Sequence, residues 1–420
     1  MREEEDRGSL HQKVMRTREL FDGTVWRGPC SILYQDGRIT SVESLPEGGP
    51  VDADVVLPGL VDCGVTAQGY QEGPVRGNPY APETAFATLC LAAGVLTVVD
   101  TGNDPGPLGH LTSMARGGVG PAIHYAVGRI ADRPRRRGDR VWRRDPSGPL
   151  GIEVATGAEF LSCGDVDSET LTAVLSAAAS DRLTVVLARA AAIGAPGLLF
   201  ARGGWPSIVG FPDAPLFSRE VAPTPDASWF APQLRSRDLW TVDGLARVQG
   251  ADRARAFLPY ARHFDKPRGL IGRRIARDVL HRLYGDRDPS AVDYPVDDLT
   301  LSWAETGCCL AASGSGVAGL VPGDSLWHEL VELEALLGTE AALRCATGST
   351  AGLTPAWDAG RIAAGHPADL VVLRGADRSS GVAVLRAAIV AVVVGGRTHD
   401  VATLEDQLED MNSRLQESLL

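Results

Sequence analysis

The ten residues at positions 57–66, Leu-Pro-Gly-Leu-Val-Asp-Cys-Gly-Val-Thr, limit most strongly what this chain can fold into. A short apolar run that follows Pro-Gly and is bounded by turn residues is typical of a buried strand. Side chains alternate between the two faces of a strand, so Asp62, Gly64 and Thr66 share one face. We expect this strand to end at a pocket, with these three positions turned toward it.

Strands alternate with helix-length segments along the middle of the chain, which is the pattern of a (β/α)8 barrel. A helix is predicted at 83–93, with Phe86, Leu89 and Cys90 on one face. Strands are predicted at 94–100, 122–127, 156–161 and 183–188. Active sites of such barrels lie at the carboxyl ends of the strands, so these ends are where catalytic residues are expected.

The two ends of the chain have a different pattern. Short alternating runs fill residues 14–56, and Asp36-Gly37 between two of them is a strong β-hairpin signal. The last helix is expected at 401–420, where an apolar stripe follows one face of a charged segment. That stripe consists of Leu404, Leu408, Met411, Leu415 and Leu419. We expect the stripe to pack on the barrel, with a homodimer contact as the alternative.

Three motifs resemble those of the amidohydrolase superfamily, of the dihydroorotase and imidazolonepropionase type. They are Pro-Gly-Leu-Val-Asp at 58–62, Asp-Gly-Arg-Ile at 36–39 and Ala-Gly-His-Pro-Ala-Asp-Leu-Val-Val-Leu at 364–373. The resemblance implies an α/β fold: a (β/α)8 TIM-like barrel over 58–359 with a small β-sandwich built from both ends of the chain, 14–57 and 360–400. Residues 1–13 are then a disordered start, and 401–420 form the C-terminal helix.

The metal ligands of that family are replaced in this sequence. The family's first strand continues with His-x-His, which binds a divalent metal, and the two histidine positions are Gly64 and Thr66 here. At the ends of the fifth and last strands, Ala188 and Ser315 occupy the places of a histidine and an aspartate. Only Glu159, on the predicted fourth strand, remains, and a catalytic zinc needs three protein ligands. The resemblance therefore implies a divergent member, and we predict no metal and no cofactor.

The other polar residues at the strand ends are the candidate site. We predict catalytic roles for Glu159, His124 and Asp104, because carboxyl and imidazole groups can transfer protons near neutral pH. We predict substrate-binding roles for a second set: Thr66, Asp100, His110, Arg189 and Ser315. Structural roles are the alternative, namely core packing for His124, turns or capping for Asp100 and Asp104, and a salt bridge for Arg189.

These expectations lead to one main hypothesis about function. It is a metal-independent enzyme that applies general acid/base chemistry to a small organic molecule, in a cyclisation, isomerisation, dehydration or hydrolysis, with bacterial specialised metabolism and biosynthesis as the setting. A metal-dependent hydrolase of cyclic amides with atypical ligands is the first alternative. A non-catalytic binding or scaffold protein is the second.

Composition limits the partners. The formal net charge of −12 argues against a nucleic-acid surface, which would need an excess of Lys and Arg. The first residues, Met-Arg-Glu-Glu-Glu-Asp-Arg, lack the apolar core of a secretory signal, and no apolar run is long enough for a membrane span. Seven cysteines without regular spacing are typical of reduced thiols. We therefore expect a cytoplasmic protein whose partner is a small-molecule substrate.

Overall fold

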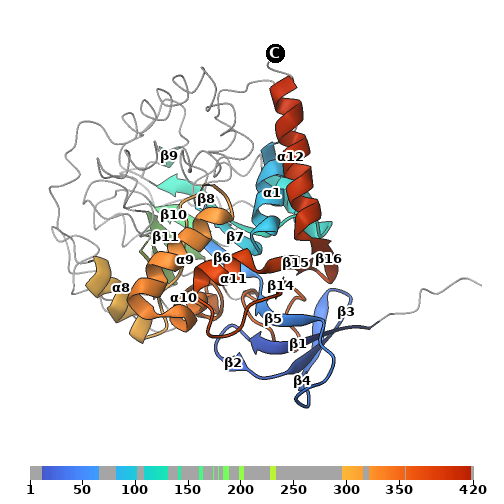
Figure 1. The fold of residues 1–420 in the computed structure, drawn as a ribbon. Helices are drawn as coiled ribbons and strands as arrows, with labels where there is room; N and C mark the ends of the chain where they lie inside the picture. Colours follow the sequence, from blue (N-terminus) through green and yellow to red (C-terminus); the bar gives the residue numbers. More distant parts are fainter. Residues whose placement is uncertain are drawn as a thin grey trace, which may run out of the picture.

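A computed structural model describes the two ends of the chain and parts of its middle (Figure 1). The described residues are 12–65, 82–101, 108–130, 141–142, 160–163, 174, 178, 183–188, 198–202, 228–232, 296–315, 321–354 and 356–417. They form a mixed α/β fold with two eight-stranded sheets. None of the helices among these residues is long and apolar enough to cross a membrane.

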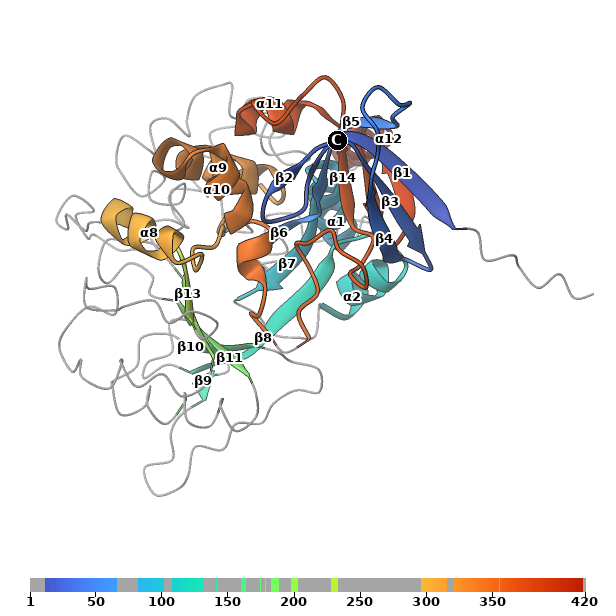
Figure 2. The ribbon, with the colours of Figure 1, turned by 90° about the horizontal axis from the view of Figure 1, so that it is seen from below.

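The first sheet joins strands from both ends of the chain. Its strands, in chain order, are β1 (Lys13–Phe21), β2 (Trp26–Arg27), β3 (Cys30–Gln35), β4 (Arg38–Ser44), β5 (Ala53–Pro58), β14 (Leu370–Leu373), β15 (Ile389–Val394) and β16 (Arg397–Asp400). In space their order is β16-β15-β14-β5-β1-β3-β4, with β2 beside β1. Figure 2 shows the C-terminal β14 among the N-terminal strands. The strands from the two ends of the chain are joined by the antiparallel pairing of β14 with β5.

The predicted hairpin at Asp36-Gly37 is confirmed, because β3 and β4 pair antiparallel on either side of it. Both turn residues have positive φ, 52° for Asp36 and 76° for Gly37, as a tight two-residue hairpin turn requires. A Cβ on Gly37 would lie 2.8 Å from the carbonyl oxygen of Gly395. Gly37 therefore also permits close packing of this turn against the turn between β15 and β16.

The second sheet begins with parallel strands. In order of pairing they are β6 (Leu60–Val65), β7 (Val95–Asp100), β8 (Ala122–Ile130), β10 (Phe160–Cys163) and β11 (Thr184–Ala188). The short β9 (Val141–Trp142) pairs parallel with β8. Beyond β11, the pairing becomes antiparallel through β12 (Leu198–Arg202) and β13 (Ser228–Ala231). The described strands thus match the barrel pattern up to β11 and depart from it afterwards.

One strand prediction needs correction. The fourth strand is expected at 156–161; residues 156–159 lie outside the described residues, and the described strand β10 (Phe160–Cys163) ends two residues later than expected. Its carboxyl end, where a catalytic group is expected, is therefore at Cys163. The apolar run Phe-Leu at 160–161 belongs to the start of the strand, and periodicity over so few residues does not determine where a short strand ends.

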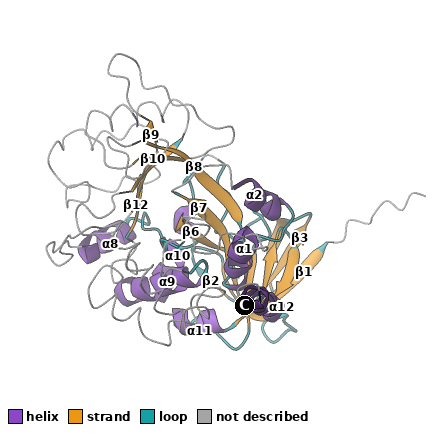
Figure 3. Cartoon of the chain, turned by 90° about the horizontal axis from the view of Figure 1, so that it is seen from above, coloured by secondary structure: helices purple, strands orange, loops and turns teal. Residues whose placement is uncertain are grey.

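The helices cover the parallel strands and the outer side of the molecule (Figure 3). They are α1 (Pro82–Ala92), α2 (Leu108–Arg116), α8 (Val296–Glu305), α9 (Asp324–Leu337), α10 (Thr339–Cys345), α11 (Val382–Ala387) and α12 (Val401–Glu417). A 3-10 turn, η5 (Gly348–Thr350), follows α10. α12 packs along α1, and the first three residues of its apolar stripe, Leu404, Leu408 and Met411, are buried.

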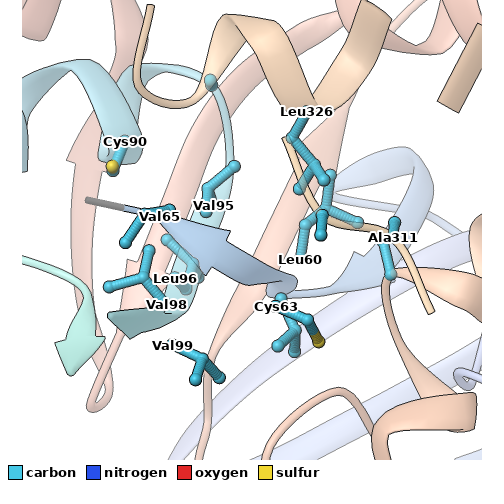
Figure 4. Close-up of a cluster of buried hydrophobic side chains, with 14 of the residues drawn as sticks. Leu60, Cys63, Val65, Cys90, Val95, Leu96, Val98, Val99, Ala311 and Leu326 are labelled. Atoms are coloured by element: carbon cyan, nitrogen blue, oxygen red, sulfur yellow. The ribbon is translucent and has the colours of Figure 1, made fainter. Parts of the chain in front are cut away.

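The segment 309–315 lies along β6 on the side opposite β7. The amide of Cys63 donates to the carbonyl of Ala311 at 3.0 Å, and the amide of Gly314 donates to the carbonyl of Gly64 at 2.9 Å. Val65 and Ser315 form a parallel β-bridge. Figure 4 shows the core beside β6, with Val65 near Val98 and Cys90. β6 is therefore an inner strand, hydrogen-bonded on both sides.

Three glycines allow the first sheet to contact the segments after α10. A Cβ on Gly348 would lie 2.1 Å from the carbonyl oxygen of Gly23. Gly23 has φ +101°, and a Cβ there would lie 2.3 Å from the carbonyl oxygen of Gly360. The amide of Gly348 donates to the carbonyl of Gly23 at 3.0 Å. The backbones approach this closely because none of the three residues has a side chain.

Candidate functional site

Asp62, the single carboxyl residue of β6, is buried, with 1% of its surface exposed. Its Oδ1 accepts hydrogen bonds from the backbone amides of Ser313 at 2.9 Å and Gly64 at 3.2 Å. Its Oδ2 accepts from the hydroxyl of Ser313 at 2.5 Å. A buried carboxyl group needs such donors, because burial without them is costly. Asp62 therefore ties segment 309–315 to β6.

Ser313 links Asp62 to Ser315. Its single hydroxyl proton is used in the bond to Asp62, so its oxygen is left as an acceptor. The backbone amide of Ser315 donates to that oxygen at 2.9 Å. Asp62 and Ser313 thus hold the backbone of Ser315 in place.

Burial changes the acidity of Asp62. Desolvation raises its pKa from 3.8 to about 6, and the hydrogen bonds from Ser313 and Gly64 oppose this rise. At neutral pH the group is mostly ionised, and ionisation of this buried group lowers the free energy of unfolding. Asp62 therefore makes the protein more stable when it is protonated.

We expect Asp62→Asn to weaken the dependence of stability on pH. A pKa raised on folding contributes stability that is fully present below 3.8 and is lost as the pH rises through about 6. Between pH 5 and pH 7 the natural protein should lose about 1 kcal/mol more unfolding free energy than the variant. Urea unfolding at the two pH values measures this difference. Asp369, whose pKa is also raised to about 6 by burial, is present in both proteins. Equal pH dependence in the two proteins would contradict the expectation.

Pairing across the strands determines which side chains share a face of the second sheet. Paired residues of neighbouring strands project to the same side, as do residues two apart on one strand. Asp62 pairs with Val98 and Val65 pairs with Asp100, because the register shifts between Asp62 and Val65. These four residues therefore share a face. The register shift interrupts the simple alternation expected along this strand between Asp62 and Val65, and Thr66 lies outside the described residues.

Two predicted substrate-binding residues fall in one row on that face. Ser315 forms a bridge with Val65, Val65 pairs with Asp100, and Asp100 pairs with Tyr125. We call these four residues the strand-end row. Ser315 and Asp100 are both fully buried. Neighbouring strands lie about 4.8 Å apart, so the Cα atoms of these two residues are about 10 Å apart.

His124 does not belong to the strand-end row. It pairs with Val99, one residue before Asp100, and so projects to the opposite face of the sheet. Its ring lies 4.5 Å from the ring of Trp357, and Trp357 lies 6.3 Å from Phe160, the first residue of β10. The structure therefore separates His124 from Asp100 and Ser315. Its catalytic role stays a prediction.

Most of the other predicted site residues lie outside the described residues. These are Glu159, Asp104, Thr66 and Arg189. His110 belongs to α2, and its side chain is also outside the described part. Within the described ranges, no three His, Cys, Asp or Glu side chains are grouped so as to hold a metal ion.

Sequence reasoning missed Asp62 and Ser313 as partners. The sequence analysis places Asp62 on the face turned toward the pocket, and it does not single out Ser313. The usable signal was a carboxylate inside an apolar strand, since such a group must find donors, together with a Ser-Gly-Ser sequence on a second strand. That signal does not say which strand supplies the donors.

No protein-family model matches the chain, and no curated protein matches its sequence. Solved structures do match in fold. A Xaa-Pro dipeptidase with bound methionine has 16% identity and a TM-score of 0.55, covering 93% of this chain and 100% of that one. A bottromycin amidohydrolase has 18% identity and a TM-score of 0.56, covering 97% and 91%. An ochratoxinase from A. niger has 13% identity and a TM-score of 0.53, covering 93% and 95%.

Proposed function

The structural neighbours are proteins of the amidohydrolase superfamily, and from this fold likeness we propose that the chain is a hydrolase-like enzyme acting on a small organic molecule. We further propose that it works by general acid/base chemistry without the family's histidine metal centre. In this proposal the second sheet and segment 309–315 belong to a (β/α)8 barrel, and the site lies at the carboxyl ends of its strands.

The observation that carries this proposal is the pairing that sets Asp100 and Ser315 on either side of Val65. Asp100 ends β7, and Ser315 lies beside the end of β6. A carboxyl group can take or give a proton, and a hydroxyl group can orient a substrate by hydrogen bonding. A separation of about 10 Å between their Cα atoms suits a small molecule that contacts both side chains.

The residue types at the strand ends support chemistry without the metal. Gly64 has no side chain that could bind a metal, and a serine hydroxyl is a poor zinc ligand compared with a carboxylate. Hydrolysis of an amide is the reaction we favour, because the dipeptidase and the amidohydrolase among the neighbours are named for it. Cyclisation, isomerisation and dehydration are less supported by these names.

We expect Asp100→Asn to lower kcat by about 100-fold or more on any amide that the protein hydrolyses, as loss of a general acid or base does. Turnover would be measured on a panel of dipeptides, N-acyl amino acids and lactams, with and without a chelator. Asp377→Asn, in an exposed turn, is the matched control and should leave turnover unchanged.

Three outcomes would contradict this proposal. Full activity of Asp100→Asn combined with loss of activity in His124→Ala would move the site to the opposite face of the sheet. Loss of turnover on chelation, with about one metal ion per chain by elemental analysis, would favour a metal-dependent hydrolase. No turnover on any substrate would favour a binding protein.

A further inference from the structure

The hydroxyl of Ser315 is a buried polar group with no hydrogen-bond partner among the described residues. Its residue is 0% exposed, and its Oγ has no hydrogen-bond partner in the part of the chain that the structure describes. Native proteins satisfy most buried hydroxyl groups, so an exception calls for an explanation. A buried hydroxyl without a partner also lowers stability. A group that is retained at such a cost is a candidate for contact with a ligand.

The surroundings keep Ser315 in this position. Its backbone amide is held by Ser313 Oγ, and Ser313 is held by Asp62. The β-bridge to Val65 fixes the other side of its backbone. The main chain at Ser315 is thus hydrogen-bonded on two sides, while the side-chain oxygen makes no hydrogen bond to the described residues. That arrangement pre-positions a single hydroxyl group.

Nearby charges indicate what kind of atom the hydroxyl can receive. Asp62 is connected to Ser315 through one serine, and Asp100 lies two strands away in the strand-end row. Asp62 is buried, and an ionised buried carboxylate repels another anion strongly because little water screens the charges. An anion brought to Ser315 would face this repulsion. An uncharged amide has no such repulsion and still accepts and donates hydrogen bonds.

We propose that Ser315 Oγ is the substrate-binding group of the strand-end row and that it hydrogen-bonds an uncharged amide of the ligand rather than a carboxylate. The proposal rests on the proposed function for the location of the site. It adds the identity of the contacting atom and the preference for an uncharged amide over a carboxylate as the group in contact. Ser315 acts here by direct contact, whereas Asp62 and Ser313 are positioning residues.

The first test measures melting temperature and needs no ligand. Ser315→Ala removes a hydroxyl without a partner, so it should raise the melting temperature by roughly 1–3 °C. Ser313→Ala removes a donor to Asp62 and should lower the melting temperature by a similar amount. Ser325→Ala, in the buried first turn of α9, is the control for loss of a buried serine hydroxyl elsewhere. A fall in the melting temperature of Ser315→Ala would show that its hydroxyl already has a partner and would overturn the proposal.

The second test uses acetamide and acetate, which have nearly the same size but differ in charge. Ligand-observed NMR on the full chain should detect acetamide binding, and the dissociation constant should rise about 5- to 10-fold in Ser315→Ala. Acetate should bind more weakly than acetamide to the natural protein. Tighter binding of acetate, equal binding of acetamide to both proteins, or no acetamide binding at all would each overturn the proposal.

Failure of this proposal can be told apart from failure of the proposed function. If Asp100→Asn abolishes turnover while Ser315→Ala changes neither stability nor acetamide binding as expected, the enzyme proposal stands and the role of Ser315 falls. If no turnover exists but acetamide binding depends on Ser315, the binding site stands and the catalytic proposal falls.

Discussion

Replacing Asp62 with alanine is expected to lower the free energy of unfolding by about 3 kcal/mol. The change removes the acceptor for three donors: the hydroxyl and amide of Ser313 and the amide of Gly64. Each buried donor left without a partner costs about 1–3 kcal/mol, and partial entry of water limits the sum. The same change releases Ser313 and, through it, the backbone of Ser315.

Urea unfolding at pH 5, where more of Asp62 is protonated than at neutral pH, would measure this loss for Asp62→Ala. Asp62→Asn is the matched variant, because its amide oxygen can still accept from the two backbone amides. We expect it to retain most of the stability that alanine loses. Equal losses in the two variants would mean that side-chain volume, and not the hydrogen bonds, makes Asp62 important.

Gly348→Ala is expected to destabilise the protein by about 3 kcal/mol, at the upper end of the usual cost of overpacking. The added Cβ would lie 2.1 Å from the carbonyl oxygen of Gly23 and 2.8 Å from its carbonyl carbon. Both are backbone atoms, so no flexible side chain can move aside. The backbone must separate instead, which would break the hydrogen bond from the Gly348 amide to Gly23.

Thermal and urea unfolding of Gly348→Ala and Gly28→Ala would separate the effect of this contact from the general effect of replacing glycine. Neither residue has a positive φ, and a Cβ on Gly28 would meet nothing within 4 Å. Gly28→Ala should therefore change stability by no more than about 0.5 kcal/mol. A comparable loss in both variants would exclude the close approach to Gly23 as the cause.

Local signals in the sequence were sufficient for much of the fold. Asp36-Gly37 predicted its hairpin because two residues with positive φ suit that turn and few other structures. The helix at α1 and the strand at β7 follow from apolar patterns that need no distant partner to be recognised. The likeness to amidohydrolase-superfamily structures agrees with the motif resemblance at the two chain ends.

The candidate site was less predictable because it depends on pairing between distant segments. A shift of register between Asp62 and Val65 places Val65 on the face of Asp62. No residue pattern within β6 predicts this shift. His124 and Asp100 were both predicted at the pocket, yet pairing of Val99 with His124 puts them on opposite faces. The antiparallel pairing of β12 likewise depends on neighbouring strands.

The pairing of β14 with β5 has a consequence for how the chain acquires its structure during synthesis. β5 ends at Pro58, but the strand that completes its outer edge begins at Leu370. A ribosome must therefore translate about 310 further residues, from Pro58 to Leu370, before this edge is covered. Until then β5 offers open backbone amides and carbonyls to any other extended chain. We infer that newly made protein is most prone to aggregate in this interval, and that loss of the C-terminal strands leaves the edge exposed permanently.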